Sequence, residues 1–170
     1  MLGQSLVLLG GWGRAPEDFR RTGSIRSVLV MALVFSGGVV LAPSALADAA
    51  DVKAVLASAR GGTSCAPLTD NPIVTHAAEI INKSTDDYVE HTARHVPIAD
   101  PLPGLRDLGY SGDKAILLQG ARPNEADAIK GMLLQGYAAI PDCSYTDFGV
   151  DVRRNETTGY SLIAVVLAGS

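Results

Sequence analysis

The feature that most constrains this chain is a short apolar segment near its start with the properties of an export signal. Several arginines, the last of them Arg26, precede an almost wholly apolar run from Val28 to Ala42. The small-x-small sequence Ala45-Leu46-Ala47 follows that run, which is the pattern of a signal-peptidase cleavage site. We therefore expect the part of the chain that folds to begin at Asp48, in an oxidising compartment outside the cytoplasm.

The alternative to a cleaved signal is a membrane anchor. The apolar run would be about 22 Å long as a helix, whereas the hydrocarbon core of a bilayer is about 30 Å thick. Because the run is too short, we interpret residues 1–47 as an N-terminal extension and signal peptide. Residues 48–170 are then a single secreted domain, located outside the cell or at the cell envelope.

The composition of residues 48–170 limits the classes of partner. This segment carries 10 Lys and Arg against 16 Asp and Glu, a formal charge of −6. An acidic domain is repelled by nucleic acids and by anionic membrane surfaces. We expect no nucleic-acid partner, and contact with a membrane only during export.

The chain has two cysteines, Cys65 and Cys143, and both lie after the expected cleavage site. An even pair of cysteines in an oxidising compartment indicates a disulfide bond. A loop of nearly 80 residues closed in this way would contribute about 4 kcal/mol on the chain-entropy model. Two free thiols are the alternative, and a metal site is disfavoured because neither cysteine has a second Cys or a His at ligand spacing.

Apolar periodicity, capping residues and turn residues predict an α+β domain. The near-continuous apolar run at 160–168 is expected to be the central strand of the sheet, covered on both faces. Helices on both sides of a small antiparallel sheet give a three-layer α-β-α sandwich. The expected elements are, in chain order, helices at 51–60, at 72 to about 91 (with Val74, Ala77, Ile81 and Tyr88 on one side) and near 105–108, a strand at 115–118, a helix at 124–136, and strands at 148–153 and 160–168.

Four segments of the sequence resemble the CAP superfamily, which contains the cysteine-rich secretory, antigen 5 and pathogenesis-related 1 proteins, in its compact bacterial form. They are Asn71-Pro72 at the start of a long helix, the segment 106–112 with its Gly-Tyr step, the strand 145–152 with its Tyr-Thr-x-x-Gly-Val pattern, and the closing strand at 160–168. The resemblance covers about residues 50–169. It implies the same three-layer sandwich and a role in binding or recognition, and some members of the superfamily bind sterols or lipids.

The resemblance also implies a cleft in which two His and two acidic residues can hold a divalent metal, and this sequence departs from that pattern. Lys114-Ala115-Ile116 stands where Glu-Asn-Ile is usual, and Gln135-Gly136-Tyr137 stands where a Gly-His step is usual. One histidine of the family, as His95 or as His91, is retained. Zinc is bound by three or four neutral or anionic ligands, and a lysine ammonium opposes it. We therefore expect no metal and no cofactor.

Three residues remain as catalytic candidates: His95, His91 and Lys114. The two histidines are four residues apart, but Thr92 follows His91 where a zinc protease has Glu, so solvated histidines at a helix end are the alternative. If Lys114 were buried among apolar groups, its pKa would fall and it could act as a base or nucleophile. A lysine exposed at the start of a strand is the alternative.

Other polar residues have simpler interpretations. His76 and Glu79 are at helical spacing and are expected to make a surface contact. Ser111 and Ser144 have no adjacent base that the sequence can place, so a serine-hydrolase triad is not supported. The sequons at Asn82 and Asn155 are treated as chance occurrences.

The leading hypothesis is a secreted, non-enzymatic CAP-like domain that binds an unidentified protein or an apolar ligand. One alternative is a cell-wall or peptide hydrolase that uses His95, and another is a lipid- or sterol-binding protein. A surface that acts in structural support or immune evasion would have the same sequence features. Neither the partner nor the oligomeric state follows from the sequence.

Overall fold

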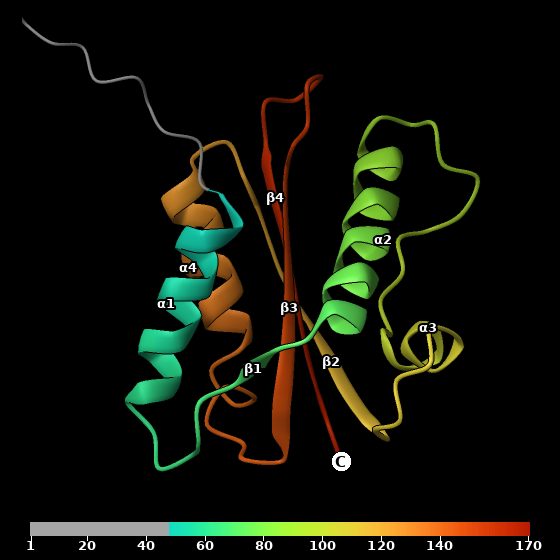
Figure 1. Cartoon of the computed structure of the whole chain (residues 1–170). Coiled ribbons are helices and arrows are strands. Elements are labelled where there is room, and N and C mark those ends of the chain that lie inside the picture. The colour runs from blue at the N-terminus through green and yellow to red at the C-terminus, as the bar shows by residue number, and fades with distance from the viewer. Residues whose placement is uncertain (1–47) are drawn as a thin grey trace, which may run out of the picture. The chain divides into compact units, whose positions relative to one another are not determined.

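A computed structural model describes residues 48–170, and the expected signal peptide lies outside the described residues. Apart from a two-residue strand at 69–70, the order of helices and strands agrees with the order expected from the sequence (Figure 1). Within 48–170, no helix is both long enough and apolar enough to span a membrane. The elements are α1 (Ala49–Gly61), β1 (Thr69–Asp70), α2 (Pro72–Val89), α3 (Leu102–Asp107), β2 (Lys114–Arg122), α4 (Glu125–Gln135), β3 (Tyr145–Arg154) and β4 (Ser161–Gly169).

The four strands form one sheet in the order β1-β3-β4-β2. Strand β4 pairs antiparallel with both β2 and β3, as predicted. The two-residue strand β1 pairs with β3 in parallel, which makes the sheet mixed. This addition was not predicted, because two residues are too few to show an alternating pattern.

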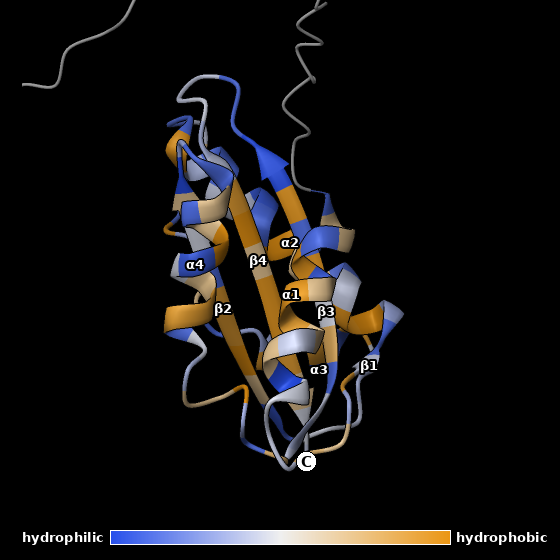
Figure 2. Cartoon of the chain, turned by 90° about the vertical axis from the view of Figure 1, so that its left-hand side faces the viewer, coloured by the Kyte–Doolittle hydropathy of each residue, from blue (hydrophilic) through white to orange (hydrophobic). Residues whose placement is uncertain are grey.

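Helices cover both faces of the sheet and give the expected α-β-α sandwich. Helices α1 and α4 lie on one face, and α2 and α3 lie on the other (Figure 1). The two faces of the sheet carry separate apolar clusters, one containing Leu56 and Met132 and the other containing Val74 and Ile81. Every residue of β4 is buried, and the orange bands of Figure 2 run along it. The prediction that 160–168 forms the central strand is therefore confirmed.

Side-chain caps start the long helices where the sequence indicated. The Asn71 carboxamide oxygen accepts from the backbone N–H of Ile73 at 3.0 Å, and that of Asn124 accepts from Asp127 N–H at 3.2 Å. Such caps satisfy backbone donors that have no partner within the helix. Asp48 does the same for α1, where its carboxylate accepts from Ala50 N–H at 2.7 Å.

The inner face of α2 differs from the prediction at its C-terminal end. Tyr88 was expected to face the sheet, but it is 49% exposed. Polar side chains continue the inward stripe instead: Asn82 donates to the backbone oxygens of Asp151 and Leu162, and Asp86 accepts from Asn155. The end of α2 is thus fastened to the β3–β4 hairpin by hydrogen bonds rather than by an aromatic ring.

These contacts also bear on the two sequons. Asn82 is 1% exposed and Asn155 is fully buried, and the amide nitrogen of each donates to neighbouring acceptors. An oligosaccharide must project into solvent. Neither asparagine can carry one in the folded domain, which agrees with their interpretation as chance sequons.

Two glycines set how closely helices approach the sheet. A Cβ atom added at Gly120 would lie 2.0 Å from the backbone oxygen of Ala128 in α4. A Cβ atom added at Gly149 would lie 2.2 Å from the backbone nitrogen of Thr75 in α2. Both helices therefore rest directly on strand backbone, one on each face of the sheet.

Candidate functional site

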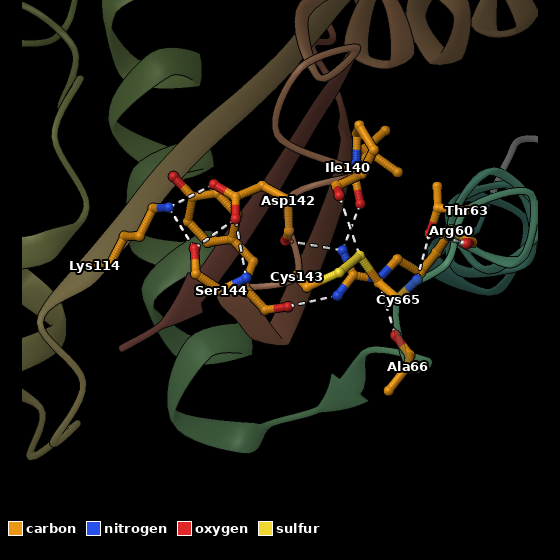
Figure 3. Close-up of a disulfide and its surroundings, with 11 residues drawn as sticks. Arg60, Thr63, Cys65, Ala66, Lys114, Ile140, Asp142, Cys143 and Ser144 are labelled. Carbon is orange, nitrogen blue, oxygen red and sulfur yellow. Dashed lines mark hydrogen bonds and ion pairs between the residues drawn. A yellow bond between two sulfur atoms is a disulfide. The ribbon is translucent and has the colours of Figure 1, made fainter.

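The predicted disulfide between Cys65 and Cys143 is present (Figure 3). It joins the loop that follows α1 to the segment that precedes β3, and the two Cα atoms are 5.1 Å apart. The cysteines are 78 positions apart in the sequence, and the residues between them include α2, α3, β2 and α4. The bond therefore closes most of the domain into one covalent loop.

A buried arginine beside the disulfide was not predicted. Arg60, in the last turn of α1, is only 2% exposed. Its Nε atom donates to the Ala66 carbonyl at 2.9 Å, and its Nη1 atom donates to the carbonyls of Ile140 (2.5 Å) and Asp142 (3.0 Å). Its Nη2 atom donates to the Tyr145 carbonyl at 2.8 Å. Figure 3 shows the guanidinium between the two cysteine-bearing segments.

Arg60 therefore holds the same two segments that the disulfide joins. Buried carbonyls need donors, and these four belong to stretches that lie outside the helices or at the start of β3. A guanidinium suits this position because its donors are fixed in one plane. The sequence did not indicate that Arg60 is buried. An arginine in the last turn of an amphipathic helix is ordinarily solvated, and its charge interacts favourably with the helix dipole.

A second polar cluster surrounds Lys114 at the start of β2. Its ammonium lies 2.6 Å from the Asp142 carboxylate and also donates to the Ser144 hydroxyl. The Ser144 hydroxyl in turn donates to Asp142 at 2.7 Å. The ammonium also lies 4.3 Å from the ring centroid of Tyr145, a cation–π distance. Lys114 is thus neither buried among apolar groups nor simply solvated at the start of a strand.

The electrostatics of this cluster keep Lys114 charged. The hydrogen bond with Asp142 raises the pKa of Lys114 above its ordinary value. The hydrogen bonds from Lys114 and then from Ser144 hold the pKa of Asp142 well below its usual range. A lysine acts as a base or nucleophile through its neutral amine, which needs a lowered pKa. The environment of Lys114 has the opposite effect.

The histidines lie at the other end of the sheet. Lys114 is paired with Gly169 at the end of β4, whereas the end of α2, which precedes His91 and His95, contacts the β3–β4 hairpin. The nine residues of β4 separate these two ends by about 26 Å. His91 has a backbone φ of 58° beyond the end of α2, and both histidines are exposed. The candidates His95 and Lys114 are therefore not brought together.

The residues present do not fit the metal site of the superfamily. Tyr137, at the position where a histidine is usual, is 78% exposed. Lys114, at the position where an acidic residue is usual, forms an ion pair with Asp142. His76 contacts Glu79 at 3.2 Å on the surface of α2, as expected. Among residues 48–170, no group of three or more His, Cys, Asp or Glu is arranged to hold a metal ion.

Three of the four segments that carry the family resemblance meet at Asp147. The Tyr110 hydroxyl donates to the Asp147 carboxylate at 2.8 Å, and the Asn71 amide donates to it at 3.3 Å. Burial, together with the hydrogen bond to Asp147, raises the pKa of Tyr110 to about 12. This contact links the Gly-Tyr segment before β2 to β3 and to the start of α2, so it organises the fold.

Two of the apolar hollows are small. One, of about 90 Å³, lies between α1, the Cys65 loop and Phe148. Another, of about 50 Å³, lies between α2, α3 and Ile98. Sites that enclose a drug-sized ligand have volumes of roughly 300–1,000 Å³. Neither hollow has room for a sterol.

Comparison with known proteins shows likeness in fold. No protein-family model matches the sequence, and no curated protein matches it. The structure is similar to that of an outer surface protein from Borrelia burgdorferi, with 10% sequence identity and a TM-score of 0.57, covering 71% of this chain and 90% of that one. It is also similar to a cysteine-rich secretory protein from Staphylococcus aureus, with 16% identity and a TM-score of 0.53, covering 72% of this chain and 38% of that longer one. The second likeness and the order of helices and strands agree with the resemblance in sequence: residues 48–170 have a CAP-like fold.

Proposed function

We propose that residues 48–170 are an exported CAP-like domain that acts outside the cytoplasm or at the cell envelope by binding a partner, without catalysis. The observation that supports the absence of catalysis is the ion pair between Lys114 and Asp142. It commits the ammonium and the carboxylate to each other, and it lies at the opposite end of the sheet from His91 and His95.

Three observations support export. Helix α1 begins at Ala49, two residues after Ala47, so cleavage after Ala47 leaves the helix and its Asp48 cap intact. The Cys65–Cys143 disulfide suits an oxidising compartment. The two structurally similar proteins are named as an outer surface protein and a secretory protein.

N-terminal sequencing tests the export. The full-length gene is expressed in a bacterial host, and the protein is collected from the medium and from the envelope fractions. We expect a protein that begins at Asp48, because Ala45 and Ala47 fit the small-residue pockets of a signal peptidase. An Ala47→Arg variant is the matched control and should keep its signal. A protein that stays in the cytoplasm, or that starts upstream of Val28, contradicts the proposal.

The competing hydrolase hypothesis requires His95, which is exposed on the loop after α2. The wild-type protein and the His95→Ala and His76→Ala variants are assayed on peptides and on purified cell-wall material. His76 is the matched control because it too is an exposed histidine. We expect no turnover by any of the three. Turnover that is lost in His95→Ala but kept in His76→Ala would establish the hydrolase instead.

The volumes of the apolar hollows do not favour the sterol- or lipid-binding hypothesis. A sterol would have to open the contacts of Phe148 or Ile98 to enter the two small hollows. A third apolar hollow, beside Leu133 and Tyr137, has a volume of about 270 Å³, which is also below the roughly 300–1,000 Å³ of sites that enclose a drug-sized ligand. We therefore propose recognition of a macromolecule through the surface as the main activity of the domain.

A further inference from the structure

The cavity beside the disulfide combines apolar walls with one cationic residue. It has a volume of about 90 Å³ and lies against the last turns of α1. Arg60 is the only charged residue that lines it, and no acidic residue does. The other lining residues are Leu56, Ala57, Gly61, Cys65, Pro67, Leu68 and Phe148.

Arg60 has one donor left over. A guanidinium carries five N–H groups. Four of them are donated to carbonyls: one from Nε, two from Nη1 and one from Nη2. The second N–H of Nη2 has no acceptor among residues 48–170.

Arg60 also has no anionic partner. Asp142 gives it only a backbone carbonyl, because the carboxylate of Asp142 is held by Lys114 and Ser144. A cation that is 98% removed from solvent is ordinarily paired with an anion. The carbonyls and the C-terminal end of α1 supply partial negative charge only. A carboxylate satisfies both needs, since it accepts the remaining N–H and carries a full negative charge.

We propose that this cavity binds a short aliphatic carboxylate. The carboxylate accepts from the free N–H of Arg60, and the hydrocarbon stem lies against Leu56, Leu68 and Phe148. The volume limits the enclosed part of the stem to a few carbon atoms, which distinguishes this site from one for sterols or long-chain lipids. This inference is independent of the proposed function, because it concerns a small ligand and a different part of the domain.

Two sources share this chemistry: a free short-chain fatty acid, and the C-terminus of a peptide that ends in an apolar residue. Hexanoate represents the first and N-acetyl-leucine the second, so their relative affinities identify the source. Hexanamide has the shape of hexanoate but no charge. It should bind at least about 10-fold more weakly, because hydrogen bonds to charged groups are stronger than those between neutral groups.

The test is a titration of the ¹⁵N-labelled full-length protein followed by NMR. Saturable shifts of the backbone amides of Gly61, Cys65 and Leu68 with hexanoate or N-acetyl-leucine, and much weaker shifts with hexanamide, are expected. No saturable shift with either carboxylate would overturn the proposal. Equal affinity for hexanamide would also overturn it, since the cavity would then recognise apolar shape alone.

A pair of variants locates the site. Ala57 is exposed and lines the cavity, whereas its neighbour Ser58 is exposed and does not. Ala57→Phe should fill the mouth of the cavity and weaken hexanoate binding at least about 10-fold, while Ser58→Phe should leave it unchanged. Equal effects of the two substitutions would place binding elsewhere. If Ala57→Phe does not fold, the comparison of hexanoate with hexanamide on the unsubstituted protein still tests the proposal.

Discussion

Arg60 joins backbone segments that no sheet ladder connects. Its four acceptors come from the loop after α1, the segment before β3 and the first residue of β3. Lysine has a single ammonium on a flexible stem and cannot reproduce this planar set of donors. Several buried carbonyls would then lose their partners, and each loss costs about 1–3 kcal/mol.

We therefore predict that Arg60→Lys lowers the free energy of unfolding by about 3–5 kcal/mol, measured by urea denaturation. Arg106 is exposed in the short helix α3, and Arg106→Lys is the matched control, with an expected change within about 0.5 kcal/mol. Similar changes for the two variants would show that the carbonyls are satisfied without the guanidinium.

The ion pair of Lys114 predicts a pH dependence of stability. The hydrogen bonds from Lys114 and Ser144 hold the pKa of Asp142 below its ordinary value of 3.8. A carboxyl whose pKa is depressed by folding stabilises the protein above its unfolded pKa, and this contribution is lost as the pH falls through the folded pKa. The melting temperature of Asp142→Asn should therefore lie below that of wild type at pH 7, and the gap should narrow below about pH 4.

Asp107→Asn is the control for this experiment, because Asp107 is exposed at the end of α3. Its melting temperature should follow that of wild type at every pH. A gap for Asp142→Asn that stays constant from pH 7 to pH 2 would contradict the prediction.

His91 follows the end of α2 in a left-handed backbone conformation, with a φ of 58°. Its N–H donates to the Tyr88 carbonyl, and the next N–H, of Thr92, donates to Asp87, as at many helix ends. Glycine adopts this conformation without strain. We predict that His91→Gly raises the free energy of unfolding by about 1 kcal/mol, by urea denaturation. His95→Gly, in the exposed loop, is the control and should not raise the free energy of unfolding. An equal increase for the two variants would show that relief of the left-handed conformation at His91 is not the cause.

At the scale of elements, two glycines decide whether helices can rest on the sheet. Gly120→Ala would place a methyl group against the backbone of α4, which cannot move without losing its contacts with β2. Overpacking of this kind costs about 1–3 kcal/mol or more. Gly131, within α4, has open space around it, so Gly131→Ala should instead stabilise by about 0.5–1 kcal/mol. Thermal unfolding of the two variants should shift in opposite directions, and a shared direction would contradict this account.

The sequence predicted those elements whose signals are local. Asn71-Pro72 and Asn124 are caps that act within three residues, and the apolar run at 160–168 reports burial on both faces. Strand β1 was missed because its pairing with Asp147 and Phe148 lies far along the chain. The prediction for Tyr88 was wrong because Asn82 and Asp86 occupy the inward side of the last turns of α2. These polar residues face inward because the β3–β4 hairpin offers them hydrogen-bond partners.

At the scale of the whole molecule, the candidate site was less predictable than the fold. The disulfide could be predicted from the number of cysteines and the export signal. Arg60 could not, since its acceptors lie up to 85 residues away and are backbone atoms that any residue would supply. Lys114 was identified as unusual, but the sign of its pKa shift depends on Asp142, which only the folded chain brings to it.

The closed covalent loop described above has a consequence for a molecule exposed to proteases. Arg94 is exposed in the irregular stretch between α2 and α3, where trypsin should cut the native protein first. Because Cys65 precedes this point and Cys143 follows it, the two fragments should migrate as one band without reductant and as two bands with it. Arg94→Gln should resist the cut, and separation without reductant would contradict the linkage. A single cut in that stretch would thus break the polypeptide while the disulfide keeps the two fragments in one molecule.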